Sequence, residues 1–159
     1  CNDRGITDIT YNSGYKLGKQ TIYSAYTRLY QTTNKTATLK CSSDIRDKFS
    51  ATSIYGNAKL AYPVALITAD EMALAGGRYA SKNENYYLHT NGYFATMTPC
   101  YFPTSDVASH ISRVNPDGSL DVNWVTTWLG LRPVINIHSD VLISSGDGTV
   151  DSPYQLTLS

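Results

Sequence analysis

The chain has 159 residues, and its 13 Lys and Arg residues balance 13 Asp and Glu residues, so the formal net charge is zero. No stretch concentrates basic residues, which argues against nucleic acid as a partner. The length suits one domain with a substantial core, and no apolar run approaches the roughly 18 residues of a membrane-spanning helix. The low charged fraction (16%) and the 13 Tyr residues are typical of secreted, β-rich domains.

The first residues, Cys-Asn-Asp-Arg, form neither the basic n-region nor the apolar h-region of an export signal. The sequence also lacks an initiator Met. We therefore expect a processed product or fragment, lacking upstream precursor residues, that is located outside the cell or on the cell surface.

Three cysteines, Cys1, Cys41 and Cys100, allow one disulfide and one unpaired thiol. We favour Cys1 with Cys41, because both lie in polar, loop-like sequence where a disulfide would hold down a weak N-terminal segment. Closing that loop contributes about 4 kcal/mol in the chain-entropy model. Two alternatives remain open: three reduced thiols in a cytosolic protein, or a lipid-bearing Cys1 at the start of a lipoprotein.

The N-terminal third contains one helical pattern, at residues 21–30. Its apolar residues recur at helical spacing and predict an amphipathic helix with the aromatic face inward. These residues are Ile22, Tyr23, Tyr26, Leu29 and Tyr30. Residues 31–57 are polar and predict loops, with a short strand at 38–41.

A strand followed directly by a helix is the clearest local signal. Residues 64–67 form a compact apolar run that suits a buried strand. Thr68 and Glu71 then make a capping box that starts a helix, and Gly76 ends it. Asp70 and Glu71 complement the helix dipole in its first turn, which explains them better than a catalytic carboxylate pair does.

The remaining sequence predicts a meander of short antiparallel strands. Residues 86–90 and 93–97 alternate around Asn91-Gly92, a strong hairpin signal, and residues 109–114 and 119–122 flank a turn at 115–118. Residues 131–138 predict a central, mostly apolar strand. A tight turn at 146–149 precedes a last strand at 154–158. The predicted fold class is α+β, a single domain of short helices packed on these strands.

The sequence lacks the spacings that catalytic and metal sites require. His89, His110 and His138 stand far apart without zinc-ligand spacing, and there is no Gly-x-Ser-x-Gly turn. Cys100 lies within an aromatic strand and suits a small buried hydrophobic residue better than a nucleophile. The acids and glycines of 140–151 do not fit an EF-hand. We predict no metal, no cofactor and no enzymatic activity, and calcium at residues 140–151 stays open as an alternative.

Aromatic and polar residues gather in the strand-rich half. They combine the rigid anchors and adaptable polar groups of binding surfaces, although alternation along a strand turns about half of them inward. The predicted ligand-binding residues are Asn91, Tyr93, Tyr101, Asn123, Trp124 and Trp128.

Several segments, in order along nearly the whole chain, resemble a known family. They include Cys1-Asn-Asp-Arg, Thr38-Leu-Lys-Cys41, Tyr62-Pro-Val-Ala-Leu-Ile-Thr-Ala-Asp-Glu71, Gly130-Leu-Arg-Pro-Val-Ile-Asn-Ile137 and Gly146-Asp-Gly-Thr149. The family is a domain of exported surface proteins of gut and other Gram-positive bacteria, often attached to pilin-like or repeat-bearing proteins.

That family looks related to the C-type-lectin-like fold shared by formylglycine-generating enzymes and the variable proteins of diversity-generating retroelements. The resemblance implies that Arg132 is a structural arginine, that Cys1 and Cys41 are partners, and that more of the precursor precedes Cys1. Formylglycine-generating enzymes use a cysteine pair, whereas only Cys100 lies in the corresponding half here. Their activity is therefore not implied.

We expect a non-enzymatic, adhesin-like domain that binds a glycan or protein through the face with Tyr93, Tyr101, Trp124 and Trp128. The alternative is a structural subunit of a pilus-like or other self-assembling appendage, packed against copies of itself or a carrier surface protein. An enzyme that uses Cys100 with a histidine is a third hypothesis. We expect neither nucleic acid nor membrane insertion.

Overall fold

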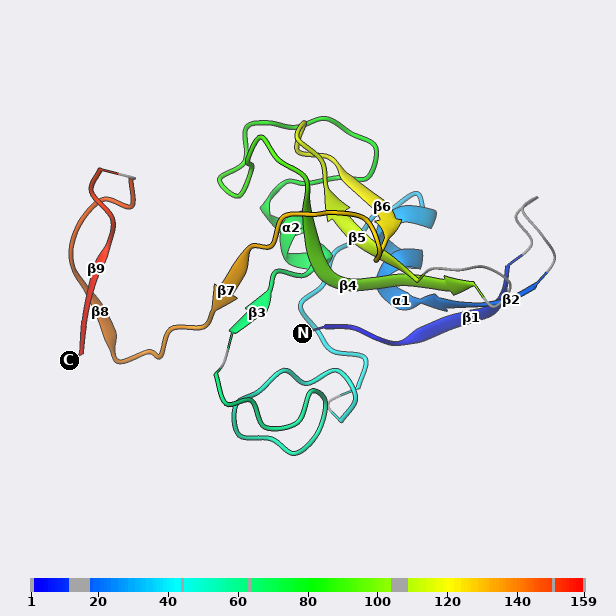
Figure 1. Ribbon diagram of the computed structural model, residues 1–159, viewed down its shortest axis with the longest axis horizontal. Helices are drawn as coiled ribbons and strands as arrows, with labels where there is room; N and C mark the ends of the chain where they lie inside the picture. Colours follow the sequence, from blue (N-terminus) through cyan, green and yellow to red (C-terminus); the bar gives the residue numbers. More distant parts are fainter. Residues whose placement is uncertain are drawn as a thin grey trace.

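An antiparallel sheet of five strands forms the centre of the molecule, in the order β1-β2-β4-β5-β6 (Figure 1). The computed structural model describes residues 2–11, 18–43, 45–62, 64–103, 109–149 and 151–158. The strands are β1 (Ile6–Tyr11), β2 (Gly18–Tyr23), β4 (Phe94–Pro103), β5 (His110–Val114) and β6 (Leu120–Trp124). Short helices pack against this sheet, so the α+β prediction is confirmed.

Strands β5 and β6 form the hairpin that the sequence predicts at 109–122. Val114 pairs with Leu120, and His110 pairs with Trp124 at the open end. Gly118 closes the turn with a φ of 77°, where a Cβ would lie 1.7 Å from the carbonyl oxygen of Asn83. Only glycine fits this position, so the turn signal in the sequence is confirmed.

The helix expected at residues 21–30 begins later than predicted. Its first residues belong to β2, where Ile22 pairs with Tyr101 of β4. Helix α1 (Ser24–Tyr26) follows and continues into η1 (Thr27–Gln31), a single π-helical turn. Strand pairing with β4 thus overrides the local helical spacing. Within the helical part, Leu29 and Tyr30 are buried as predicted, whereas Tyr26 is half-buried and Ala25, which was not predicted to face inward, is fully buried.

The predicted strand and capped helix are present as β3 (Val64–Leu66) and α2 (Ala69–Ala75). The Thr68 hydroxyl accepts the backbone N–H of Glu71 at 3.2 Å, and the Glu71 carboxylate accepts that of Thr68 at 2.8 Å. Gly76 ends the helix with a φ of 127°. The expectation of a buried strand is wrong, because the Val64 side chain is 46% exposed.

The strand expected at 131–138 is neither central nor as long as predicted. Only β7 (Pro133–Ile135) is extended, and it pairs with β3 in a separate sheet of two strands. Pro133 has no N–H to donate, which confines it to the margin of a sheet. Ile135 is 63% exposed, as expected for a peripheral strand.

Two further predicted strands are loops. Residues 86–90 do not pair with β4; instead Tyr86 is buried and donates its hydroxyl hydrogen to the Gly118 carbonyl at 2.9 Å. Gly92 does not adopt the positive φ that a type I′ turn requires. Residues 38–41 are also a loop, in which the Thr38 N–H donates to Asp70 Oδ1 at 3.0 Å. Each of these residues is held by a contact distant in sequence.

The chain ends in a hairpin that stands apart from the rest of the molecule (Figure 1). Strand β9 (Gln155–Leu158) was expected, whereas β8 (Val141–Ser145) was not. The predicted turn between them is confirmed, with φ values of 90° at Gly146 and 84° at Gly148. Every residue of the two strands is exposed except Val141, which is half-buried.

The main core lies between the central sheet and the helices. Its buried members come from η1, α2, β4, β5 and β6, together with two residues outside these elements. They are Leu29, Tyr30, Ile67, Ala69, Met72, Tyr86, Phe94, Cys100, Val114 and Leu120. Within the described part of the chain, no helix combines the length and apolar character needed to cross a membrane.

A buried ion network fastens the N-terminal segment to helix α2. The Arg28 guanidinium contacts Asp3 at 2.9 Å and Asp70 at 2.6 Å. Asp3 also accepts the Ser42 hydroxyl at 2.6 Å, so the network joins four segments that are distant in sequence. Asp70, expected only to complement the helix dipole, therefore has a specific partner that lies outside its helix.

Candidate binding surface

A ladder of rings crosses three neighbouring strands at one end of the central sheet. Tyr101 of β4 pairs with His110 of β5, which pairs with Trp124 of β6. The Tyr101 and His110 rings stack with centroids 4.0 Å apart, and the Trp124 ring meets His110 edge-on at 6.2 Å. Such cross-strand aromatic pairs stabilise a sheet and hold the rings in place. Trp124 is 56% exposed, so the ladder ends at the surface.

The ladder is backed by a row of tyrosines on α1 and η1. Tyr101 also contacts Tyr26, with ring centroids 5.2 Å apart, and Tyr26 stacks on Tyr30 at 5.3 Å. Tyr30 is buried, and its hydroxyl is hydrogen-bonded to Ser112 Oγ. The exposed end of the ladder is thus anchored in the core, which fixes the orientations of its rings.

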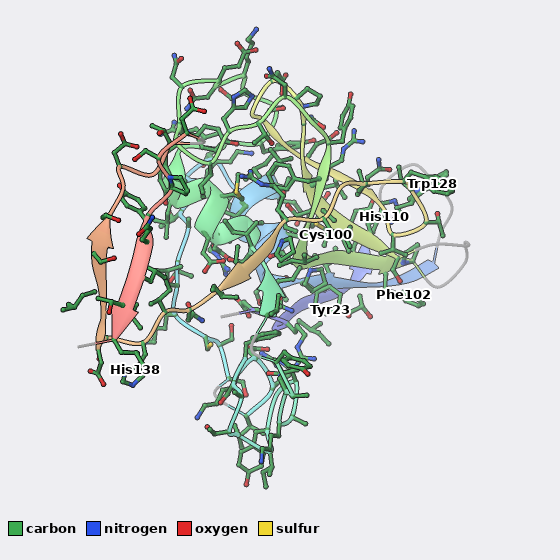
Figure 2. All side chains as sticks on the ribbon, turned by 60° about the vertical axis from the view of Figure 1, so that its left-hand side comes forward. Tyr23, Cys100, Phe102, His110, Trp128 and His138 are labelled. Carbon is green, nitrogen blue, oxygen red and sulfur yellow. The ribbon has the colours of Figure 1, made fainter. Side chains whose placement is uncertain are left out.

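The turn after β6 presents the second tryptophan. Asn123 Oδ1 accepts the Trp124 N–H at 2.8 Å and the Thr127 hydroxyl at 3.1 Å, and the Thr127 N–H donates to the Trp124 carbonyl at 3.0 Å. Trp128 follows this turn and is 99% exposed. Figure 2 shows His110 and Trp128 far from His138, which lies beside the C-terminal hairpin. We call Tyr101, His110, Trp124 and Trp128 the aromatic end.

The structure does not bring all the predicted ligand-binding residues together. Tyr93 is exposed, and its ring faces the Arg113 guanidinium at 4.9 Å. Arg113 lies between the buried residues Ser112 and Val114, so it belongs to the opposite face of the sheet from the ladder. Asn91 is exposed in the loop before β4. The Tyr93 ring therefore lies on the Arg113 side of the sheet and outside the ladder, and a shared binding role of Tyr93, Tyr101, Trp124 and Trp128 stays a prediction.

Asn123 has a different role from the predicted one, and His110, which was not among the predicted ligand-binding residues, joins the site. The Asn123 carboxamide oxygen is engaged within the turn, so this residue positions Trp124 and Trp128. His110, which sequence reasoning considered only as a metal or catalytic candidate, joins the two aromatic residues beside it. The sequence placed His110 in the predicted strand at 109–114. Its stacking on Tyr101 depends on the register between β4 and β5, which the sequence alone did not indicate.

The remaining candidates for chemistry are dispersed. His89 Nε2 is hydrogen-bonded to the Pro116 carbonyl at 2.7 Å, and His138 Nδ1 lies 3.2 Å from Asp140 Oδ2. Asp147 accepts the N–H and the hydroxyl of Thr149, as expected for an acid in a Gly-rich turn. Among the residues described, His, Cys, Asp and Glu form no group of three or more that could hold a metal ion.

The Cys100 thiol is a core group. It is fully buried, and burial together with the negative charge of Asp121 raises its pKa far above the ordinary thiol value. Because the thiolate is the nucleophilic form, a thiol in this position stays protonated and unreactive near neutral pH. The prediction of a buried, hydrophobic cysteine is confirmed.

The other two cysteines are those of the disulfide predicted at the N-terminus. Cys41 is disulfide-bonded, whereas Cys100 is free. Cys1 lies outside the described residues, so its pairing with Cys41 stays a prediction. Asp47 holds the loop around Cys41 in place, because its carboxylate accepts the backbone N–H groups of Arg4 and Ser43 at 3.0 and 3.1 Å.

A groove that sequence reasoning missed lies beside α2, β3 and β7. Its volume is about 580 Å³. Its walls are mostly apolar and include Leu66, Leu74, Leu88, Val134 and Ile135, with residues 49–51 at one side. Glu71 also lines it but is engaged in the capping box. The lining comes from segments far apart in the chain, so no local pattern could have indicated it.

Comparison of the chain with protein-family models, with curated proteins and with solved structures found no match.

Proposed function

We propose that this protein is a non-enzymatic, extracellular or cell-surface domain that binds its ligand by stacking on the aromatic end. The observation that carries the proposal is the 99% exposure of Trp128, next to a turn whose hydrogen bonds fix its backbone. Leaving a large apolar ring in water forgoes roughly 2 kcal/mol or more of burial free energy. Tryptophan is also the residue most enriched among binding hot spots.

An uncharged glycan is the ligand class that the surroundings favour. Residues 122–131 carry no charged side chain, and Thr126 and Thr127, which follow Trp124 in the sequence, have hydroxyl groups, of which that of Thr127 donates to Asn123 Oδ1. Flat aromatic faces with neighbouring hydroxyl and indole N–H groups suit a ring-shaped ligand that is apolar on its faces and polar at its edges. A charged ligand would need complementary charges that this segment lacks.

A C-type-lectin-like fold is part of the proposal. It is supported by the mixture of short helices and antiparallel strands and by the disulfide at Cys41. The segments that resemble exported surface domains, at 1–4, 38–41, 62–71 and 130–137, support it further. In this fold Arg132 has a structural role, consistent with its donation to the Leu88 carbonyl at 2.6 Å and its position 4.7 Å from the Phe94 ring.

The two tryptophans make the proposal directly testable, because the chain has no others. A glycan array would identify ligands, and a titration followed by tryptophan emission would report binding at the aromatic end alone. We expect Trp128→Ala to weaken binding at least about tenfold, the loss of one hot-spot contact. Its free energy of unfolding should change by less than about 0.5 kcal/mol, since the side chain is exposed.

Tyr62→Ala is the matched control for this experiment. Tyr62 is 80% exposed, and it precedes β3 rather than lying at the aromatic end. Its removal should leave both affinity and emission change intact. Ligands that bind Trp128→Ala as tightly as the unaltered chain would contradict the proposal, and a protein ligand captured through Trp128 would correct the ligand class.

A self-assembling structural subunit is the second candidate, because the C-terminal hairpin exposes apolar side chains. Leu142, Ile143 and Leu156 are each at least half exposed. An appendage subunit would grow into filaments or rings as concentration rises, which electron microscopy would detect. A binding domain would stay at a small, fixed size.

A further inference from the structure

The C-terminal hairpin has one apolar face and one polar face. The register pairs Val141 with Leu158 and Ile143 with Leu156, and these four side chains share a face. Leu142 pairs with Thr157 on the other face. Ile143 and Leu158 are 61% and 78% exposed, so the apolar face is largely uncovered within the monomer.

The exposed apolar face of the hairpin would be stabilised by packing against another apolar surface. An isolated two-stranded hairpin is marginally stable in water, and a sheet with one apolar face gains stability by packing that face on another layer. In Figure 1 the connection after β7 leads the hairpin away from the body. The partner of this face must therefore come from a rearranged chain or from another molecule.

The groove beside α2 has the matching chemistry, and it adjoins the hairpin. Ile135 lines the groove and also a shallow hollow that it shares with Val141, Leu156 and Leu158 of the hairpin. The groove is lined mainly by aliphatic side chains and is open to solvent near Leu74, which is itself exposed. An apolar hairpin face would fill it.

The charges of the two parts are opposite. Residues 133–159 contain three Asp and no Lys or Arg, whereas residues 31–62 contain five Lys or Arg and two Asp. Residues 31–62 supply Leu39 and Phe49 to the groove. Lys40 and Lys48, next to these two residues, are exposed. An acidic hairpin that approaches a groove with a basic rim is favoured in orientation and in association rate.

We propose that two copies of this chain exchange their C-terminal hairpins, the apolar face of each covering the groove of the other. Because each hairpin starts at the rim of its own groove, a two-fold axis at this rim places both hairpins on the opposite grooves at once. The arrangement is isologous and closes at two copies. It is separate from the proposed ligand site, since Trp128 lies far from His138, the residue beside the hairpin, in Figure 2.

The first test compares two Asp substitutions in β8, one on each face, by sedimentation equilibrium of the full chain. The unaltered chain should be dimeric at high concentration. Ile143→Asp should raise the dimer dissociation constant about a hundredfold, because the contact occurs twice per dimer and each loss is worth about tenfold. Leu142→Asp adds the same charge one residue away, on the polar face, and should dimerise normally.

A second variant keeps the test valid even if Ile143→Asp unfolds the hairpin. Leu74→Asp changes the exposed groove wall on α2 and leaves the hairpin intact; it should also weaken dimerisation about a hundredfold. Mixing Ile143→Asp with Leu74→Asp restores one intact hairpin–groove contact, so mixed dimers should form more readily than dimers of either variant alone. High salt should weaken the dimer.

Three results would overturn the proposal. The first is a chain that stays monomeric at concentrations of several hundred micromolar. The second is equal loss of dimer in Leu142→Asp and Ile143→Asp. The third is normal dimerisation of Leu74→Asp, which would mean that the hairpins pair with each other instead of entering grooves.

Discussion

Helix α2 and the C-terminal hairpin are both specified by strong local sequence signals, yet their surroundings differ completely. The helix has its capping box, its terminal glycine and a first-turn acid, and it places Met72 in the core. The hairpin has an equally clear Gly-Asp-Gly turn but leaves its strands exposed. Local signals thus determine that an element forms, whereas the contacts made across the chain determine how much stability depends on it.

The strongest test of this contrast removes the centre of the α2 network. Arg28→Ala would leave Asp3 and Asp70 as buried carboxylates without their cation, so we expect the free energy of unfolding to fall by about 3 kcal/mol. Urea denaturation followed by circular dichroism would measure this. The control is Lys82→Ala, which removes a solvent-exposed pair with Glu84 and should leave the free energy of unfolding nearly unchanged. Similar losses in both variants would contradict the contrast.

The same network predicts sensitivity to acid. Burial would raise the pKa of Asp3, but the hydrogen bonds from Ser42, Gly5 and Arg28 outweigh it and lower that pKa below the ordinary value of 3.8. A carboxyl with a lowered folded-state pKa contributes stability that is present above the unfolded value and is lost as pH falls through the folded value. We therefore expect the free energy of unfolding to be constant just above pH 5 and to fall below about pH 4.

Asp3→Asn separates this contribution from general acid denaturation. The variant should be less stable at neutral pH and should lose less stability on acidification than the unaltered chain. Urea midpoints measured from pH 3 to pH 7 would show this as converging curves. Parallel curves would mean that other carboxyls, such as Asp47, whose pKa is also lowered, control the acid transition.

A smaller effect is expected at the helix cap. Thr68→Ala removes the acceptor for the Glu71 N–H while leaving the helix sequence unchanged, and it should lower the free energy of unfolding by about 1 kcal/mol. Thr68→Ser keeps the hydroxyl and should recover most of the loss. If serine fails to recover it, the buried methyl group of Thr68 and not the cap would be the stabilising feature.

The smallest effect should follow from deleting residues 140–159. Because this hairpin forms its own two-stranded sheet, we expect the free energy of unfolding of the remaining chain to change by less than about 0.5 kcal/mol at micromolar concentration. A loss above about 2 kcal/mol would show that the hairpin supports the body within one molecule and would remove the contrast with α2.

The sequence was informative wherever a structure depends on neighbouring residues. The Thr68 and Glu71 pair, the glycine at 118 and the glycines at 146 and 148 each require a local geometry that few residues satisfy. These features were predicted correctly.

The incorrect predictions have the opposite cause, because they fall where the structure depends on contacts between residues distant in sequence. Ile22 becomes part of a strand because Tyr101 lies opposite it, and Tyr86 leaves a predicted strand because the Gly118 carbonyl accepts its hydroxyl. The same distinction holds at the candidate site. The aromatic composition indicated Trp124 and Trp128, but the role of His110 and the position of Tyr93 follow from strand register, which one sequence does not reveal.

The strand order has a consequence for how quickly the molecule folds. Strands β5 and β6 are joined by a short turn, so this hairpin can form within microseconds. The junction of β2 with β4 instead pairs Ile22 with Tyr101, and about half of the chain lies between these two residues. Because such a long loop must close before its contacts stabilise it, we expect this junction to form late and to set the overall folding rate.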